Sequence, residues 1–103
     1  LKQVFLNLLL NSLDAMNGHG RLDIATAARG AELEVAIADN GAGIAPKDLP
    51  HIFDPFFSTK TDGTGLGLAI VQGIVQEHRG HIKVQSQLGQ GTTMCVFLPA
   101  AAD

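Results

Sequence analysis

Asp39-Asn40-Gly41-Ala42-Gly43-Ile44 is the stretch of this 103-residue sequence that decides its fold, and Gly63-Thr64-Gly65-Leu66-Gly67-Leu68 is its counterpart further along the chain. The first stretch follows an alternating apolar run, which predicts a strand that ends in a carboxylate beside glycines that let a flat ring come close. The second places three glycines at alternate positions before a helical pattern, where free N–H groups and a helix N-terminus attract phosphate oxygens. Together the two stretches predict one nucleotide-binding site.

The composition indicates one soluble domain over residues 1–103, because 46% hydrophobic residues suffice for a single two-layer core. A formal net charge of -3, without a cluster of Lys or Arg, argues against binding to nucleic acid or to an anionic membrane surface. The apolar run from Val4 to Leu10 is far shorter than the ~20 residues that cross a bilayer. The single cysteine, Cys95, fits a reducing compartment and a place in the core. We therefore expect a cytoplasmic domain without direct membrane contact.

The periodicity predicts the order helix, two strands, irregular segment, helix, two strands. Helices are expected over residues 1–16 and 67–79, the second capped by Gly80, and strands over residues 20–28, 32–39, 81–87 and 92–98. The prolines and phenylalanines of residues 45–62 predict a short helix followed by an irregular lid. This order predicts an α/β two-layer sandwich with helices on one face of a sheet. The apolar side of the first helix is expected to consist of Leu1, Phe5, Leu8, Leu9, Leu13 and Met16.

The first predicted helix also carries a polar face, made of Gln3, Asn7, Asn11 and Asp14 at three- and four-residue steps. A solvated helix surface would explain this stripe. The alternative is a magnesium site, because amide oxygens are good neutral ligands for a hard cation that arrives with substrate phosphates. The glycine stretches favour the second interpretation.

Two interpretations also apply to Asp39, since Asp-Asn-Gly is an ordinary turn sequence. As a functional residue, Asp39 would accept a hydrogen bond from the exocyclic amine of adenine, which contributes roughly 1.5 to 3 kcal/mol. Gly41 and Gly43 would clear space for the ring. Guanine carries a carbonyl in place of that amine, so the same carboxylate would reject it.

The segment from Gly63 to Gly67 is a weak signal when taken alone. Dinucleotide-binding and P-loop patterns both fail, because no strand precedes it, the third glycine of GxGxxG is missing and no Gly-Lys-Ser or Gly-Lys-Thr occurs. A protein-kinase fold fails for lack of its catalytic-loop and metal-binding signatures. Thr59 and Lys60 are either phosphate contacts from the lid or ordinary polar loop residues.

Four segments, taken in order, resemble the N, G1, F and G2 boxes of the catalytic ATP-binding domain of bacterial sensor histidine kinases: Asn7-Leu8-Leu9-Leu10-Asn11-Ser12, Asp39 to Ile44, Ile52-Phe53-Asp54-Pro55-Phe56-Phe57 and Gly63 to Leu68. The resemblance runs from Leu1 to Pro99, and Phe56-Phe57-Ser58-Thr59-Lys60 with a short lid is most similar to the nitrogen-regulatory type. It implies the Bergerat fold, an α/β two-layer sandwich with a mixed β-sheet, which gyrase, the Hsp90 chaperones and the MutL repair proteins share. It also implies ATP and Mg²⁺ as cofactors.

The resemblance assigns roles to particular residues. Asn11 is the implied Mg²⁺ ligand, with Asn7 beside it, and Asp39 is the implied adenine-reading carboxylate. Asn7, Asn11 and Lys60 form the implied catalytic group. Thr92 would act through water, and Phe53, with Phe56 and Phe57, would set the lid. The full set of implied nucleotide contacts is Asn11, Asp14, Ala15, Asp39, Gly41, Gly43, Ile44, Phe53, Thr59, Lys60, Thr64, Gly65, Leu66, Gly67, Leu68 and Thr92.

The chain departs from the family pattern at three places. Asp14 stands where many members carry a basic residue, which leaves Lys60 to supply phosphate charge. His78-Arg79-Gly80 replaces the usual His-Gly-Gly, which favours a structural over a catalytic role for His78. The family's first strand would precede Leu1, so we expect this piece to lack that strand together with the dimerisation domain.

The ATP-hydrolysing relatives place a Glu where this chain has Asn7, so we expect slow hydrolysis and transfer of the γ-phosphoryl group to a protein, driven by Mg²⁺ and positioning. No histidine of the chain is followed by an acidic and then a basic residue, as the family's phosphoacceptor is; the four are His19, His51, His78 and His81. The resemblance thus implies an acceptor histidine on a separate dimerisation domain of the same kinase, which also serves the response regulator.

We expect this piece to be a monomer and its parent a homodimer, with any membrane anchor upstream. Two rival activities stay open. One is a serine kinase of the anti-sigma-factor type, which shares these boxes. The other is a non-catalytic nucleotide sensor, which Asp14 favours.

Overall fold

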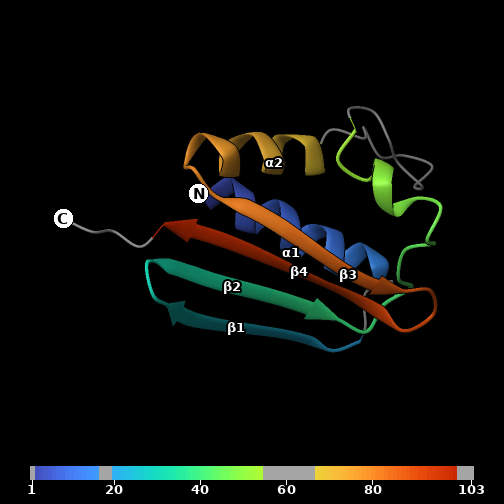
Figure 1. The fold of residues 1–103 in the computed structure, drawn as a ribbon. Helices are drawn as coiled ribbons and strands as arrows, with labels where there is room; N and C mark the ends of the chain where they lie inside the picture. Colours follow the sequence, from blue (N-terminus) through green and yellow to red (C-terminus); the bar gives the residue numbers. More distant parts are fainter. Residues whose placement is uncertain (1, 17–19, 55–66, 100–103) are drawn as a thin grey trace.

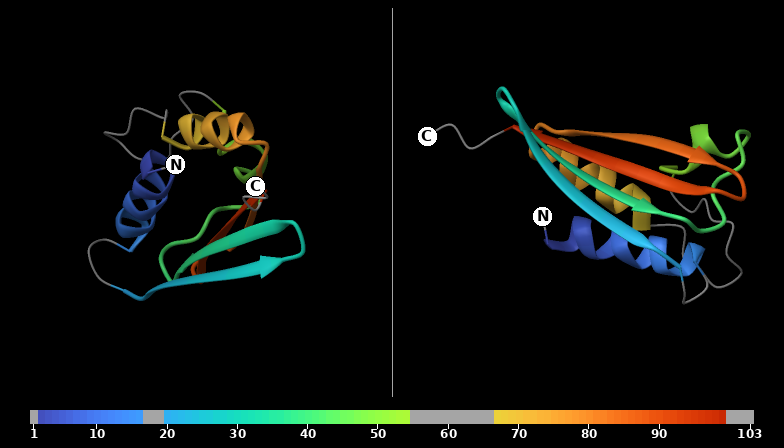
Figure 2. Two further views of the ribbon diagram at one scale, coloured as in Figure 1. Left: turned by 90° about the vertical axis from the view of Figure 1, so that its left-hand side faces the viewer. Right: turned by 90° about the horizontal axis from the view of Figure 1, so that it is seen from below.

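The computed structural model describes residues 2–16, 20–54 and 67–99, which form two layers (Figure 1). One layer is a sheet of four strands, β1 (Leu22–Arg29), β2 (Glu32–Asp39), β3 (His81–Gln87) and β4 (Gly91–Pro99). The other contains the helices α1 (Lys2–Ala15) and α2 (Gly67–Glu77), which contact each other, and a short 3-10 helix, η1 (Leu49–His51), follows β2 in the chain. Figure 2 shows both α-helices on the same side of the sheet. The predicted α/β two-layer sandwich is thus confirmed.

The sheet has the order β1-β2-β4-β3, and all three of its described pairings are antiparallel. The expectation of a mixed sheet is therefore wrong for the described residues. The reason is that β4 lies between β2 and β3. Strands β2 and β3 run in the same direction but are not neighbours, so these two described strands do not form a parallel pair.

The core lies between the helices and the inward face of the sheet. Its most deeply buried side chains are Val4, Leu8, Val71, Val75 and Val96. On α1 the buried line continues through Ser12 to Met16, while Leu13 is 47% exposed, so the expected core role of Leu13 is wrong. Leu13 lies five residues after Leu8 and is therefore rotated well away from the buried line of a helix with 3.6 residues per turn. Leu1 lies outside the described residues.

An apolar cleft of about 210 Å³ opens between α1 and the strands β1 and β2, lined by Phe5, Leu9, Ile24, Val35 and Ile37. Next to it, three leucines on the outer side of α1 are about half exposed: Leu6, Leu10 and Leu13. The sandwich therefore leaves a continuous apolar surface along α1 uncovered.

Helix α2 ends in a Schellman motif whose left-handed residue is Arg79. The Arg79 N–H donates to the Gln76 carbonyl (2.9 Å), the Gly80 N–H donates to the Val75 carbonyl (2.9 Å), and Arg79 has φ 63°. A Cβ on Gly80 would collide with the carbonyl oxygen of Phe97. The predicted cap is thus corrected by one residue: Arg79 adopts the strained conformation, and Gly80 is needed for space.

Among the described residues, helices long and apolar enough to cross a bilayer are absent.

Candidate nucleotide site at the end of β2

Asp39 is the last residue of β2, as predicted, and lies in a row of four residues across the end of the sheet. Its cross-strand partners are Leu22 on β1 and Thr92 on β4, and Thr92 in turn pairs with Ser86 on β3. Cross-strand partners share a face of the sheet, and Thr92 is buried together with the core residues of β4. The row therefore faces the helix layer, which carries Asn11, Gly67 and Leu68 of the residues that the resemblance assigns to the nucleotide.

The Asp39 carboxylate is tied to the loop that follows it. Its Oδ1 accepts a hydrogen bond from the Gly41 N–H at 2.9 Å, which is the local bond expected of an aspartate in a turn. The turn interpretation is thereby supported. This bond also restrains the orientation of the carboxylate, as a hydrogen bond to the adenine amine would require. The role of Asp39 in binding adenine stays a prediction.

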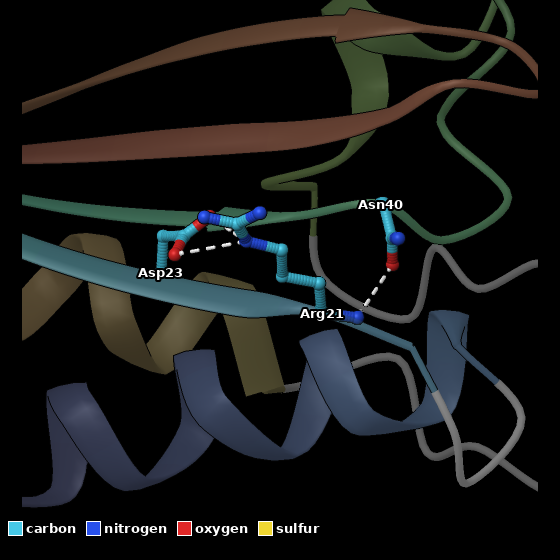
Figure 3. Close-up of polar contacts among 3 residues, drawn as sticks. All are labelled: Arg21, Asp23 and Asn40. Atoms are coloured by element: carbon cyan, nitrogen blue, oxygen red, sulfur yellow. Dashed lines mark hydrogen bonds and ion pairs between the residues drawn. The ribbon is translucent and has the colours of Figure 1, made fainter.

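Asn40 forms hydrogen bonds within the protein (Figure 3). Its Oδ1 accepts the Arg21 N–H at 2.7 Å, and its own N–H donates to the Arg21 carbonyl at 3.2 Å. The Arg21 side chain turns to Asp23, with Nε 3.0 Å from Oδ2. Asn40 therefore fastens the start of β1 to the exit of β2.

The glycines after Asp39 are required by close contacts within the protein. A Cβ on Gly41 would lie 2.6 Å from the carbonyl oxygen of Ala15, at the end of α1. Gly43 has φ 75°, and a Cβ there would collide with the carbonyl oxygen of Gln87. Glycine is thus needed at both positions for contacts within the protein, and the role of the two glycines beside an adenine ring stays a prediction.

The loop of residues 41–44 is clamped between α1 and the β3–β4 hairpin. On one side the Ala42 N–H donates to the Ala15 carbonyl at 3.0 Å. On the other the Gly89 N–H donates to the Ala42 carbonyl at 2.7 Å, and the Ile44 N–H donates to Ser86 Oγ at 2.7 Å. These bonds bring together Ala15, Asp39, Ile44 and Thr92, all of which the resemblance assigns to the nucleotide.

Ser86 is the residue of this site that the sequence did not reveal. It also donates to the Gly91 carbonyl (3.0 Å) and lies 2.8 Å from Thr92 Oγ1. The available signal was a hydroxyl at the inward position of an alternating strand, after Ile82 and Val84. That signal did not identify its partners, which come from other segments.

The polar face of α1 lies on the helix that meets this loop. Asn7 and Asn11 are half-buried and Asp14 is exposed. Amide and carboxylate oxygens are the donors that suit Mg²⁺, so this set fits the predicted cation. Clusters of three or more His, Cys, Asp or Glu side chains able to hold a metal are absent from the described residues. The predicted Mg²⁺ is of the kind that arrives shared with substrate phosphates.

Several predicted contacts lie outside the described residues: Thr59, Lys60, Thr64, Gly65 and Leu66, with the lid residues Phe56 and Phe57. Of the same set, Gly67 is the first residue of α2, and Leu68 and Phe53 pack against the core. The helix that the sequence predicts after the glycine stretch thus begins at its last glycine, Gly67, and the contact with phosphate stays a prediction.

The side chains of His78 and Cys95 are chemically reactive types, but their contacts fit structural roles. The His78 Nδ1–H donates to the Ile74 carbonyl at 2.8 Å, which fits a structural role. Cys95 is half-buried on the outer face of the sheet and not in the core, where it was predicted to lie. Its burial, followed by the nearby Glu34 carboxylate, raises the pKa of its thiol. A thiol that stays protonated is a poor nucleophile.

Comparison with known proteins places this geometry in one family. The model of the histidine kinase-, DNA gyrase B- and HSP90-like ATPases matches residues 1–102. The chain is 46% identical over 99 residues to the sensor histidine kinase ZraS of Escherichia coli K12, covering 96% of this chain and 21% of ZraS. It is 41% identical over 103 residues to sporulation kinase C of Bacillus subtilis 168, covering 100% of this chain and 24% of that kinase. The chain therefore spans about a fifth of the length of these relatives.

Solved structures of histidine kinases have the same fold. The mycobacterial sensor histidine kinase MprB superposes with a TM-score of 0.84 at 30% identity, over 94% of this chain and 70% of MprB. The nucleotide-free catalytic domain of histidine kinase ThkA gives 0.84 at 33% identity, over 95% of this chain and 64% of that domain. Full-length ShkA in complex with AMPPNP gives 0.83 at 33% identity, over 98% of this chain and 22% of ShkA. The chain belongs to the family of histidine kinase-, DNA gyrase B- and HSP90-like ATPases, within which these relatives are histidine kinases.

Proposed function

We propose that this chain binds Mg-ATP and donates the γ-phosphoryl group to a histidine on a separate dimerisation domain of a sensor kinase. The observation that carries the proposal is the fixed carboxylate of Asp39 at the end of β2, beside a loop clamped at both ends. The similarity to sensor histidine kinases over nearly the whole chain supports the same activity.

The roles follow from the chemistry of the side chains. Asp39 accepts the adenine amine, and Asn11, with Asn7 beside it, holds Mg²⁺ through amide oxygens. When Mg²⁺ is bound, it neutralises part of the phosphate charge. Asn7 cannot remove a proton from water, so the chain positions the phosphoryl group for transfer and hydrolyses ATP slowly. Lys60 and Thr59 contribute phosphate contacts from the lid.

The partner is the dimerisation domain that carries the acceptor histidine, and through it a response regulator. In this proposal the chain acts as a monomeric catalytic unit of a homodimeric parent. The unit is cytoplasmic even where the parent is anchored to a membrane upstream. The three histidines in the described residues are exposed, and two of them have local partners, Asp54 for His51 and Ile74 for His78.

The first test is a titration of the chain with ATP, with and without Mg²⁺, alongside Asp39→Asn. The asparagine keeps an oxygen for the Gly41 N–H but replaces one acceptor with an NH₂ donor, so ATP affinity should fall roughly ten-fold or more. Asp23→Asn, on an exposed carboxylate of the same sheet, is the matched control and should leave the affinity unchanged. Equal ATP binding by Asp39→Asn and the native chain would overturn the assignment of Asp39.

A second test separates the reaction classes. With γ-labelled ATP and the dimerisation domain of the parent kinase, we expect acid-labile label on that domain, since phosphohistidine is unstable in acid. Acid-stable label would favour the serine-kinase alternative. Binding without transfer to any acceptor would favour the nucleotide-sensing alternative, which Asp14, three residues after Asn11, also favours.

A further inference from the structure

Ser86 Oγ joins three segments that meet beside Asp39. The Ile44 N–H, from the loop after β2, donates to it at 2.7 Å. The carbonyl of Gly91, at the start of β4, lies 3.0 Å away, and Thr92 Oγ1 lies 2.8 Å away. A serine hydroxyl has one proton and two lone pairs, so three partners use its whole capacity.

This capacity decides where the protons lie. The Ile44 N–H can only donate and the Gly91 carbonyl can only accept, so Ser86 gives its one proton to Gly91 and accepts from Ile44. Its second lone pair is then left for Thr92, whose hydroxyl must be the donor of the 2.8 Å contact. Thr92 Oγ1 therefore has no second proton to give and offers only lone pairs to any other group.

The direction of the Thr92 hydroxyl matters because of its neighbour. Thr92 is 8% exposed and is the cross-strand partner of Asp39. The Cβ atoms of such partners lie about 4.5 to 5.5 Å apart. A carboxylate and a hydroxyl that acts only as an acceptor thus lie side by side at the end of the sheet. This pair can accept hydrogen bonds from an amine but repels a carbonyl oxygen.

We propose that Ser86 is a positioning residue for nucleotide recognition, which keeps Thr92 an acceptor beside Asp39 and fastens the loop of residues 41–44 to the β3–β4 hairpin. The proposal rests on the proposed binding of adenine at Asp39. Adenine presents an amine to this pair of acceptors, whereas guanine presents a carbonyl oxygen that both repel. Ser86 thereby contributes to the choice of ATP over GTP although it acts only through Thr92 and Ile44.

The test compares ATP and GTP affinities in four variants. Ser86→Ala leaves the Ile44 N–H without its acceptor and lets the Thr92 hydroxyl turn its proton towards the base. We expect ATP affinity to fall about five- to ten-fold and the preference for ATP over GTP to shrink by a similar factor. Thr92→Val should reduce the preference while leaving the loop attached. Ser86→Thr, which keeps the hydroxyl, should restore the native preference, and Thr93→Val, on the outer face of the same strand, should change neither affinity.

Amide hydrogen exchange at Ile44, in the absence of nucleotide, provides a readout of the loop. Exchange should speed up in Ser86→Ala and stay native in Thr92→Val and Thr93→Val, with folding of each variant checked by circular dichroism. The proposal is overturned if folded Ser86→Ala keeps both the native ATP-to-GTP ratio and the native exchange rate at Ile44. In that case, native ATP binding that still depends on Asp39 would leave the proposed function intact. Failure of the native chain to bind ATP would overturn both proposals.

Discussion

Arg79 adopts a backbone conformation that L-amino acids avoid, at φ 63° where α2 ends. The left-handed conformation costs a residue with a Cβ about 1 kcal/mol or more, and glycine avoids that cost. Arginine at this position has a partial compensation, because a positive charge near the C-terminus of a helix is favourable. The chain therefore retains a local strain that a single substitution can remove.

We expect Arg79→Gly to raise the free energy of unfolding by about 1 kcal/mol, because relief of the strain outweighs the greater flexibility of the unfolded chain. Urea denaturation of the native chain and the variant measures the difference. Arg79→Ala is the control that loses the charge and keeps the strain, and it should show no gain. A variant with Gly at 79 that is less stable than the native chain would contradict this account.

At the scale of elements, the loop of residues 41–44 shows what a sequence can and cannot predict. The alternation of β2 and the position of Asp39 at its end are local properties, so the sequence predicted them correctly. A role for the glycines at positions 41 and 43 was also predicted, but the packing requirement for them was not. It depends on Ala15 and Gln87, which only the folded chain brings close. The role of Ser86 was not predicted for the same reason, because its partners come from distant segments.

Errors in the larger pattern have similar causes. The exposure of Leu13 depends on how α1 is rotated over the sheet, and the antiparallel order depends on β4 entering between two strands. Both are decided by packing between elements, which the periodicity of a single element does not contain. The two-layer class survives these errors because it requires only the number and order of elements.

The clamped loop gives a prediction with a matched control in Gly30. Gly43 and Gly30 have φ 75° and 61°, but a Cβ at Gly30 would meet nothing within 4 Å, whereas one at Gly43 would collide with the Gln87 backbone. We expect Gly30→Ala to cost about 1 kcal/mol of unfolding free energy through φ alone. Gly43→Ala should cost about 3 kcal/mol or more and should weaken ATP binding. Similar losses in urea denaturation would show that the collision is relieved by movement of the loop.

At the scale of the whole molecule, the apolar cleft between α1 and the β1–β2 hairpin leaves part of the sandwich open. Its lining residues and the half-exposed leucines of α1 form one surface. Contiguous apolar surfaces of this kind attract apolar ligands or other proteins. The folded chain should therefore bind a fluorescent apolar dye such as ANS without being unfolded.

We expect Ile24→Asp to abolish most of the ANS fluorescence, because it places a charge in the lining of the cleft at a position that is already 56% exposed. Leu88→Asp is the matched control, since Leu88 is 65% exposed and does not line the cleft. Fluorescence titration at constant protein concentration measures the effect. Equal loss in both variants would indicate diffuse binding to the surface.

The order of the strands also governs how the molecule folds. Each hairpin joins neighbours in sequence, and such pairs close quickly, whereas the central β2–β4 seam joins strands more than half the chain apart, so we expect it to form later than the hairpins. Asp39 and Thr92 are partners across that seam, so the proposed recognition site is complete only once β2 and β4 have paired. A nucleotide at that site would bind only the chain in which β2 and β4 are paired, and would therefore stabilise the whole folded domain against unfolding.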